Sequence, residues 1–209
     1  SLNYIGCGFN QITNLNLSQN TALTEYLNCE SNQLTSLDLS YLPNTIHQIE
    51  AQDNLLSYVV MPENINVGKY VDLRNNLIDS INFYSVSDIY IEALKLTNNQ
   101  LTHLDLRNVT YKLLQIDSNQ LSSLDLRNND NTNVGDIQAY DNPNLTCISV
   151  DDTAYSNTNW TLANGYEFDP QVNFSDDCNA KTYVPDDNFE AYLETHDANG
   201  NTVSIGDPT

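Results

Sequence analysis

The fold is decided by a short phrase at residues 94–101, which read Leu-Lys-Leu-Thr-Asn-Asn-Gln-Leu. Related phrases recur along the chain, each centred on one asparagine: Asn10, Asn32, Asn54, Asn76, Asn99, Asn119 and Asn142. Successive members of this series are 22, 22, 22, 23, 20 and 23 residues apart. A nearly constant period of this length predicts a solenoid in which each repeat forms one coil.

Each repeat contains two segments in which apolar residues alternate with polar ones. Around Asn99, the first segment has Leu94 and Leu96 before the asparagine, and the second has Leu104 and Leu106 after it. Alternation of this kind is typical of a short strand with one buried face. We therefore predict a mainly β solenoid with two short strands in each coil of roughly 22 residues, arranged in parallel sheets.

At this level of detail the repeats resemble the leucine-rich repeat, whose signature is alternating leucines followed by asparagine and another leucine. The best matches are residues 94–101 and 114–121. The Asn-Gln-Leu tripeptide and the Leu-Asp-Leu-Ser/Arg return segment resemble the variety found in bacterial cell-surface proteins of the internalin-like or adhesin type. The resemblance covers residues 2 to about 150 and implies a leucine-rich repeat solenoid; such repeats serve many partners.

The repeated asparagines are predicted to be structural. A buried amide at one position of every coil can satisfy backbone groups that a tight turn leaves unpaired, and losing it would cost roughly 1–3 kcal/mol per stranded group. Cys7 and Cys29 occupy the same inward position in neighbouring coils. We interpret them as two buried thiols, with a strained disulfide as the alternative.

The composition divides the chain into three parts. Residues 1–145 are predicted to form a leucine-rich repeat array of about seven coils with a truncated N-terminal end, and residues 146–179 a C-terminal cap rich in aromatic side chains. Residues 180–209 are predicted to hold a linker and the start of a further module, with a short trailing helix within 184–193.

Two cysteines enclose the cap. A Cys147–Cys178 disulfide would close a loop of about 32 residues and contribute on the order of 3–4 kcal/mol in the chain-entropy model. Such a bond predicts a location outside the cytoplasm.

The charge balance excludes several classes of partner. The 209 residues include 7 Lys+Arg and 28 Asp+Glu, giving a formal net charge of -21. Phosphate backbones and anionic membrane surfaces would repel this chain, so we predict no nucleic-acid partner. Because no stretch approaches the ~20 apolar residues of a membrane span, we also predict no direct membrane insertion.

Catalytic signals are missing from the sequence. His47, His103 and His196 lie at unrelated repeat positions without zinc-ligand spacing, and no nucleophile elbow or phosphate-binding glycine loop occurs. We therefore predict that the protein is not an enzyme and holds no cofactor, with calcium as the one open question.

Clusters of oxygen-bearing side chains are the calcium candidates. They are Asp151, Asp152, Asp197 and Asn199. Carboxylates and amides are the ligands that calcium prefers. The alternative is that these acidic loops are simply solvated.

The candidate ligand-binding surface is the outward face of the first strand of each coil. The resemblance to leucine-rich repeats implies that this face is concave. Its members lie six, four and two positions before the repeated asparagines: Tyr4, Tyr26, Asn28, Glu30, Gln48, Glu50, Gln52, Tyr70, Asp72, Arg74, Lys95, Asp117 and Tyr140. Tyrosine offers a large rigid contact surface, and acids, amides and arginine supply oriented hydrogen bonds. Alternatively, the tyrosines only stabilise the sheet by cross-strand stacking.

These observations predict an extracellular or bacterial cell-surface module that binds a protein or a glycan, as in adhesion, within a larger surface protein. Other modules of the same longer chain are expected partners. The alternative function is that of a structural spacer, one scaffold unit of a multi-module surface or secreted protein. In that case the acidic side chains serve solubility.

Overall fold

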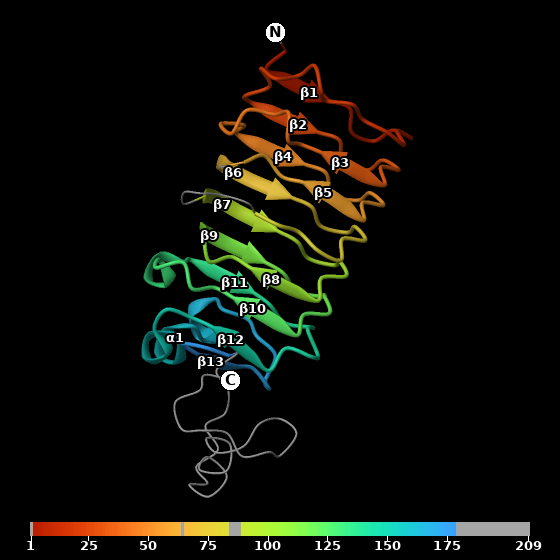
Figure 1. Ribbon diagram of the computed structural model, residues 1–209. Coiled ribbons are helices and arrows are strands. Elements are labelled where there is room, and N and C mark those ends of the chain that lie inside the picture. The colour runs from red at the N-terminus through yellow and green to blue at the C-terminus, as the bar shows by residue number, and fades with distance from the viewer. Residues whose placement is uncertain (1, 64, 84–88, 179–209) are drawn as a thin grey trace, which may run out of the picture. The chain divides into compact units, whose positions relative to one another are not determined.

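The computed structural model describes residues 2–63, 65–83 and 89–178 (Figure 1). The chain divides into two units: Ser1–Cys178, to which all described residues belong, and Asn179–Thr209, which lies outside the described residues. The predicted linker, the trailing helix and the calcium candidates Asp197 and Asn199 all fall in that second unit.

The described unit is a parallel β-solenoid of about eight turns. Seven parallel strands form its first sheet, in the spatial order β1 (Tyr4–Gly6), β2 (Tyr26–Asn28), β4 (Gln48–Glu50), β6 (Asn66–Asp72), β7 (Ile89–Lys95), β9 (Val109–Gln115) and β11 (Asp136–Gln138). Each strand pairs with the equivalent segment of the next coil. The predicted mainly β solenoid with coils about 22 residues apart is thereby confirmed.

Return strands form the second side of the solenoid. β3 (Ser36–Asp38) pairs with β5 (Tyr58–Val60), and a four-stranded sheet contains β8 (His103–Asp105), β10 (Ser123–Asp125), β12 (Cys147–Ser149) and β13 (Asn173–Ser175). Residues 15–17 and 81–83 have the same apolar alternation but are not strands. Two strands per coil is therefore the rule for most coils and not for all.

The apolar side chains of both sides meet in one continuous core. Leu94, Leu96, Leu101 and Leu106 are fully buried, and the equivalent residues of the other inner coils are buried with them. Burial weakens at the N-terminal coil, where Ile5 and Cys7 are only partly covered. Cys7 and Cys29 are both free thiols, of which Cys29 is buried as predicted and Cys7 is half-buried.

The repeated asparagines form a ladder at the turn between the two sides. The amide nitrogen of Asn99 donates to the carbonyl of Leu96 in its own coil and to that of Leu73 in the preceding coil, both at 3.0 Å. Its amide oxygen accepts from the backbone N–H of Ile78 at 3.0 Å. The same pattern recurs at Asn32, Asn54, Asn76, Asn119 and Asn142. The ladder is therefore structural, as predicted.

A left-handed backbone conformation precedes every ladder asparagine. The seven residues involved have φ between 51° and 57°: Phe9, Ser31, Asp53, Asn75, Asn98, Ser118 and Asp141. Most are short polar residues, which tolerate this conformation better than bulky ones. This turn directs the asparagine side chain inward.

The cap continues the solenoid as an irregular last turn. Glu167 forms an isolated bridge to Gln138 of β11, and β13 pairs with β12 on the return side. α1 (Thr153–Asn159) and the 3-10 turn η2 (Leu162–Asn164) lie between β12 and β13 in the chain, and a second 3-10 turn, η1 (Asn131–Asn133), lies earlier, between β10 and β11. The predicted Cys147–Cys178 disulfide is present and fixes the end of this turn.

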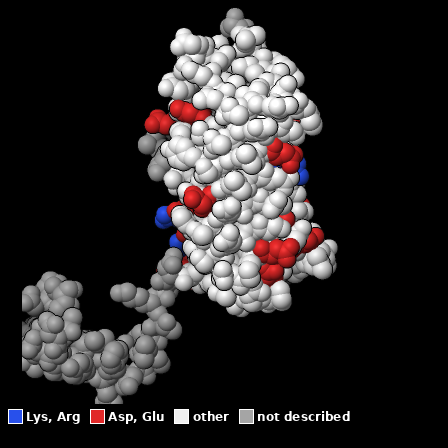
Figure 2. Space-filling model, turned by 90° about the vertical axis from the view of Figure 1, so that its right-hand side faces the viewer, with Lys and Arg blue, Asp and Glu red and all other residues white. Residues whose placement is uncertain are grey.

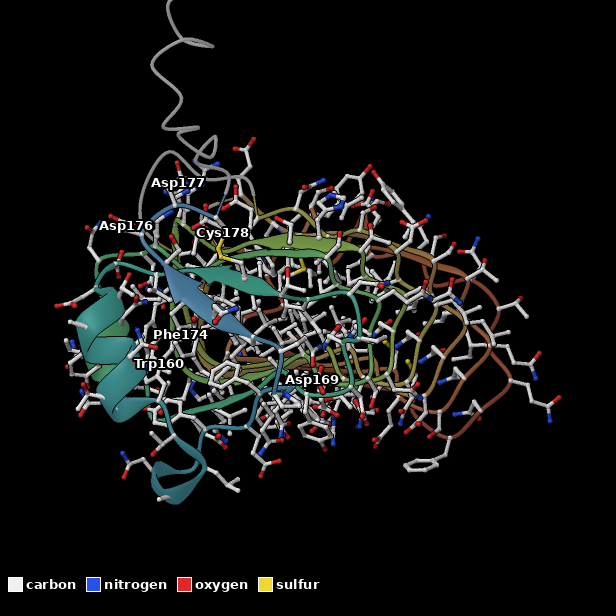
Figure 3. The ribbon with its side chains drawn as sticks, turned by 90° about the horizontal axis from the view of Figure 1, so that it is seen from below. Trp160, Asp169, Phe174, Asp176, Asp177 and Cys178 are labelled. Carbon is white, nitrogen blue, oxygen red and sulfur yellow. A yellow bond between two sulfur atoms is a disulfide. The ribbon has the colours of Figure 1, made fainter. Side chains whose placement is uncertain are left out.

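Aromatic side chains close the end of the core. Trp160 packs against Phe174 with ring centroids 5.5 Å apart (Figure 3). The ring centroid of Phe168 lies 5.2 Å from that of Phe174. Trp160 is 3% exposed. These rings cover the apolar end that a simple stop in the repeat would leave open to water.

The negative charge is unevenly distributed on the side of the solenoid shown in Figure 2. Red acidic groups gather there in a few patches, the largest at the lower right of the view, with uncharged surface between the patches. The formal net charge of -21 therefore does not form an even coat on this side.

Candidate functional site

Strand pairing arranges the predicted surface residues in columns that run across the seven-stranded sheet. Tyr4 is paired with Tyr26, Tyr26 with Gln48 and Gln48 with Tyr70. A second column contains Asn28, Glu50, Asp72 and Lys95. We call the thirteen predicted residues on this face the tyrosine–acid strip. The structure brings them together in neighbouring coils as the repeat spacing predicted.

Glu50 is the centre of the strip. The hydroxyl groups of Tyr26 and Tyr70 both donate to its carboxylate, one to each oxygen. Gln48 donates to the same carboxylate at 2.9 Å and Asn28 at 2.7 Å. Glu50 therefore holds two tyrosines from different coils in fixed orientations.

These contacts change the ionisation of all three groups. Burial disfavours the charged form of Glu50, but its four hydrogen bonds outweigh burial and lower its pKa. Burial, followed by the hydrogen bond to Glu50, raises the pKa of Tyr26 to about 12 and that of Tyr70 still further. At neutral pH the centre of the strip is one carboxylate held between two neutral phenols.

The network extends toward the N-terminal coils. Asn28 donates to Glu30 at 2.9 Å, and Gln52 donates to the other carboxylate oxygen of Glu30. Tyr4 packs on Tyr26 with ring centroids 4.8 Å apart and remains 57% exposed. Neither Glu30 nor Glu50 forms an ion pair within the described part of the chain. This half of the strip therefore combines aromatic surface with uncompensated negative charge.

The basic residues of the strip are already engaged. Arg74 forms a two-pronged ion pair with Asp72, at 2.6 Å for the closest atoms, and this contact raises the pKa of the Arg74 guanidinium. The ammonium of Lys95 lies 4.9 Å from the centre of the Tyr70 ring. Asp72 is only 2% exposed. Although Asp72 lies on the predicted face, its neighbours cover it, so it is not a contact residue.

The far end of the strip contains Asp117 and Tyr140. Asp117 is buried and accepts a hydrogen bond from Thr97 at 2.7 Å. Its negative charge is the largest cause of a raised pKa of Tyr140. As with Asp72, the outward position of Asp117 does not make its carboxylate accessible.

The two described calcium candidates have different surroundings. Asp152 is the N-cap of α1 and accepts from the backbone N–H of Tyr155 at 2.9 Å. The backbone N–H of Asp151 donates to Asn131 at 2.7 Å, while its side chain is exposed. Among residues 2–63, 65–83 and 89–178, no group of three or more His, Cys, Asp or Glu is arranged to hold a metal ion. The N-cap contact gives Asp152 a structural role.

The return side contains an ion-pair ladder that sequence reasoning missed. Asp105 pairs with Arg107 and Asp125 with Arg127, at 2.6 and 2.5 Å, and Arg107 also lies 3.6 Å from Asp125. The signal was present in the repeated Leu-Asp-Leu-Arg, because residues two apart on a strand share one face.

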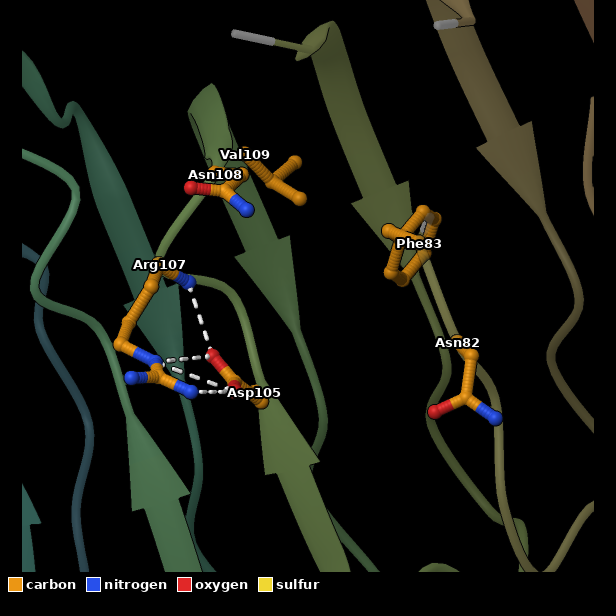
Figure 4. A pocket seen from close by; sticks show the side chains of 6 residues that line it. All are labelled: Asn82, Phe83, Asp105, Arg107, Asn108 and Val109. Carbon is orange, nitrogen blue, oxygen red and sulfur yellow. Dashed lines mark hydrogen bonds and ion pairs between the residues drawn. The ribbon is translucent and has the colours of Figure 1, made fainter. Parts of the chain in front are cut away.

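A shallow hollow of about 380 Å³ lies beside this ladder. It is lined by Asn82, Phe83, Asp105, Arg107, Asn108 and Val109 (Figure 4). The guanidinium of Arg107 is already held by Asp105. The hollow therefore presents mainly two amides and a phenyl ring.

The strip combines several kinds of chemical group on one face of the sheet. It offers flat phenol surfaces, oriented carboxylates and amides on a rigid sheet. No helix in the described ranges is long and apolar enough to cross a membrane. No protein-family model, curated protein or solved structure matches this chain significantly. The fold by itself places the protein in the class of parallel β-solenoids.

Proposed function

We propose that this protein is a binding module of a bacterial surface protein of the leucine-rich repeat class, and that the tyrosine–acid strip contacts an extracellular protein or glycan. The observation that carries this proposal is the fixed pair of tyrosines on Glu50. Two rigid phenols and an ionised carboxylate provide contact area with little loss of side-chain entropy on binding. In this proposal the module acts in adhesion and performs no catalysis.

The leucine-rich repeat assignment is supported by the coil length, the buried leucines and the asparagine ladder. An extracellular location is supported by the disulfide, since such bonds persist mainly in oxidising compartments. Binding of a ligand by the sheet face rests on the half-exposed Tyr26, Tyr70 and Glu50 and on the exposed Tyr4.

The test replaces tyrosines of the strip and compares them with tyrosines elsewhere. The double variant Tyr4→Ser/Tyr26→Ser is assayed on immobilised glycans and on immobilised extracellular-matrix proteins. Tyr41→Ser/Tyr58→Ser is the matched control, because these two tyrosines are also exposed but lie outside the strip. We expect the strip variant alone to lose at least about tenfold in retention, as for a contact hot spot. Equal retention of all three proteins would refute the proposal.

A structural spacer is the second candidate. The observation in its favour is that most polar side chains of the strip already bond to one another, which stabilises the sheet without a ligand. Under this hypothesis no immobilised probe retains the protein, and the strip variant differs from the control only in stability.

A further inference from the structure

The end of the seven-stranded sheet meets the cap at a hollow of about 380 Å³. Its apolar walls include Tyr140, Trp160, Leu162, Tyr166, Phe168 and Phe174. We call this site the cap hollow. Leu162 is 75% exposed at its rim, while Trp160 and Tyr166 are buried at its base. Apolar residues thus remain accessible at a point where the solenoid already has a well-packed end.

The aromatic walls are held in place by their own packing. The ring of Trp160 stacks on Tyr166 at 5.8 Å and on Phe168 at 6.3 Å between centroids. The hydroxyl of Tyr166 donates to the carbonyl of Val134 at 2.6 Å. The hollow is therefore formed before any ligand arrives, which lowers the entropic cost of binding.

Two carboxylates line the hollow, and they have different roles. Both oxygens of Asp169 accept from backbone N–H groups, those of Asp141 at 3.0 Å and Asn142 at 2.7 Å. The Glu167 carboxylate has no hydrogen bond or ion pair with any described residue. Burial, and then the negative charge of Glu167, raises the pKa of the neighbouring Asp136. None of the lining residues, all of which are described, is Lys or Arg.

We propose that the cap hollow binds a lysine or arginine side chain presented by a segment of a partner protein. Aromatic faces attract cations through their quadrupole, and the uncompensated Glu167 carboxylate adds direct attraction. The formal net charge of -21 favours approach of a cationic segment from a distance. The inference goes beyond the proposed function, because it needs the cap and not the tyrosines at the centre of the strip.

Trp160 makes the hollow directly observable, since it is the one tryptophan of the chain. Its indole N–H gives a single nitrogen–proton signal in the NMR spectrum of the full labelled chain. The probes are Nα-acetyl-arginine amide, Nα-acetyl-lysine amide and the uncharged arginine analogue Nα-acetyl-citrulline amide. We expect a saturable shift of the Trp160 signal with the two cationic probes, weaker at high salt, and none with the citrulline probe.

Glu167→Gln is the decisive variant, with Glu25→Gln as the matched control because the Glu25 side chain is exposed and lies in the N-terminal half of the solenoid. Removal of the charge is expected to weaken cationic binding by about fivefold or more, while the control binds as the parent does. An unchanged dispersion of backbone signals confirms that both variants fold. Absence of any shift, an equal shift with citrulline, or undiminished binding by the folded Glu167→Gln variant overturns the proposal. Tyr4→Ser/Tyr26→Ser should bind these probes normally, so this test and that of the strip fail independently.

Discussion

The side-chain nitrogen of Asn99 lies 3.0 Å from the carbonyl oxygen of Leu73 in the preceding coil. This one hydrogen bond joins two coils at a buried position where water cannot replace it. Its repetition along the ladder joins the coils, in addition to the buried leucines and the backbone hydrogen bonds between paired strands.

We expect Asn99→Ala to lower the free energy of unfolding by about 1–3 kcal/mol, because it strands the N–H of Ile78 in the interior and leaves the carbonyl of Leu73 with Asn76 as its side-chain donor. Urea denaturation followed by circular dichroism measures this change. Gln100→Ala, at the exposed neighbouring position, should have little effect.

The ladder position at the exposed end provides an internal comparison. Among the described residues, the side-chain amide of Asn10 donates only to Cys7 and Gly8 of its own coil. Asn10→Ala should therefore cost less than half as much as Asn99→Ala. Equal losses at the two positions would contradict the account of the ladder as a link between coils.

A second prediction concerns the way the solenoid ends. In the inner coils, the residue that precedes each ladder asparagine donates its backbone N–H to a carbonyl of the next coil. The N–H of Asn98, for example, donates to the carbonyl of Asp117 at 3.1 Å. At the last coil the carboxylate of Asp169 takes this role for Asp141 and also for Asn142. Asp169→Ala should destabilise the protein by about 1–3 kcal/mol.

The same denaturation experiment tests this substitution. Asp79→Ala removes an exposed carboxylate whose only described contact is with Ser80, so it should leave stability nearly unchanged. A result in which both aspartate variants behave alike would mean that Asp169 does not close the last coil.

The repeat itself could be predicted from the sequence, whereas its irregular parts could not. Spacing alone placed Tyr26 beside Gln48 and Glu50 beside Asp72, because a parallel solenoid keeps equivalent positions in register. The role of Asp169 could not be predicted, since a side chain replaces backbone atoms there and no periodic signal marks it.

Length differences between strands were also missed. β6, β7 and β9 have seven residues each, and the pairing of β6 with β7 shifts between Val67 and Tyr70. The extension buries Tyr111 to 1% exposure. The extra length of these strands depends on how their side chains pack, and the spacing of the asparagines carries no information about it.

For the strip, the repeat spacing predicted the right neighbours but not their accessibility. The burial of Asp72 beside Arg74 depends on side-chain conformation, which the spacing does not determine.

The disulfide gives a third prediction. Cys147 and Cys178 are 31 positions apart, so breaking their bond should lower the free energy of unfolding by about 3–4 kcal/mol in the chain-entropy model. Thermal melting with and without reductant measures the loss, and Cys147→Ser/Cys178→Ser should reproduce it without reductant.

Counting of thiols is the control for the reductant. The unfolded, unreduced chain should react with two equivalents of thiol reagent, through Cys7 and Cys29. After reduction it should react with four. Four reactive thiols before reduction would show that the bond does not form.

The last prediction uses the ionisation of Tyr26. Burial and then the hydrogen bond to Glu50 raise its pKa from 10.0 to about 12. The folded state therefore holds the phenol proton more tightly than the unfolded state does. The resulting stabilisation is complete below pH 10 and is lost as the pH rises from about 10 to about 12.

Glu50→Gln removes the carboxylate but keeps the size of the side chain. The pKa of Tyr26 should fall, because burial and Tyr4 still raise it but the hydrogen bond to the Glu50 carboxylate and its negative charge no longer do, and the alkaline loss of stability should shrink. NMR titration of ring-labelled tyrosine resolves Tyr26 when Tyr26→Phe is used to assign its signal. Glu25→Gln should leave the titration unchanged, because the exposed Glu25 side chain is not among the causes of the raised pKa of Tyr26. If Tyr26 titrates identically with and without the Glu50 carboxylate, the hydrogen bond that organises the strip does not exist in solution, and the strip loses the rigidity on which its proposed binding role depends.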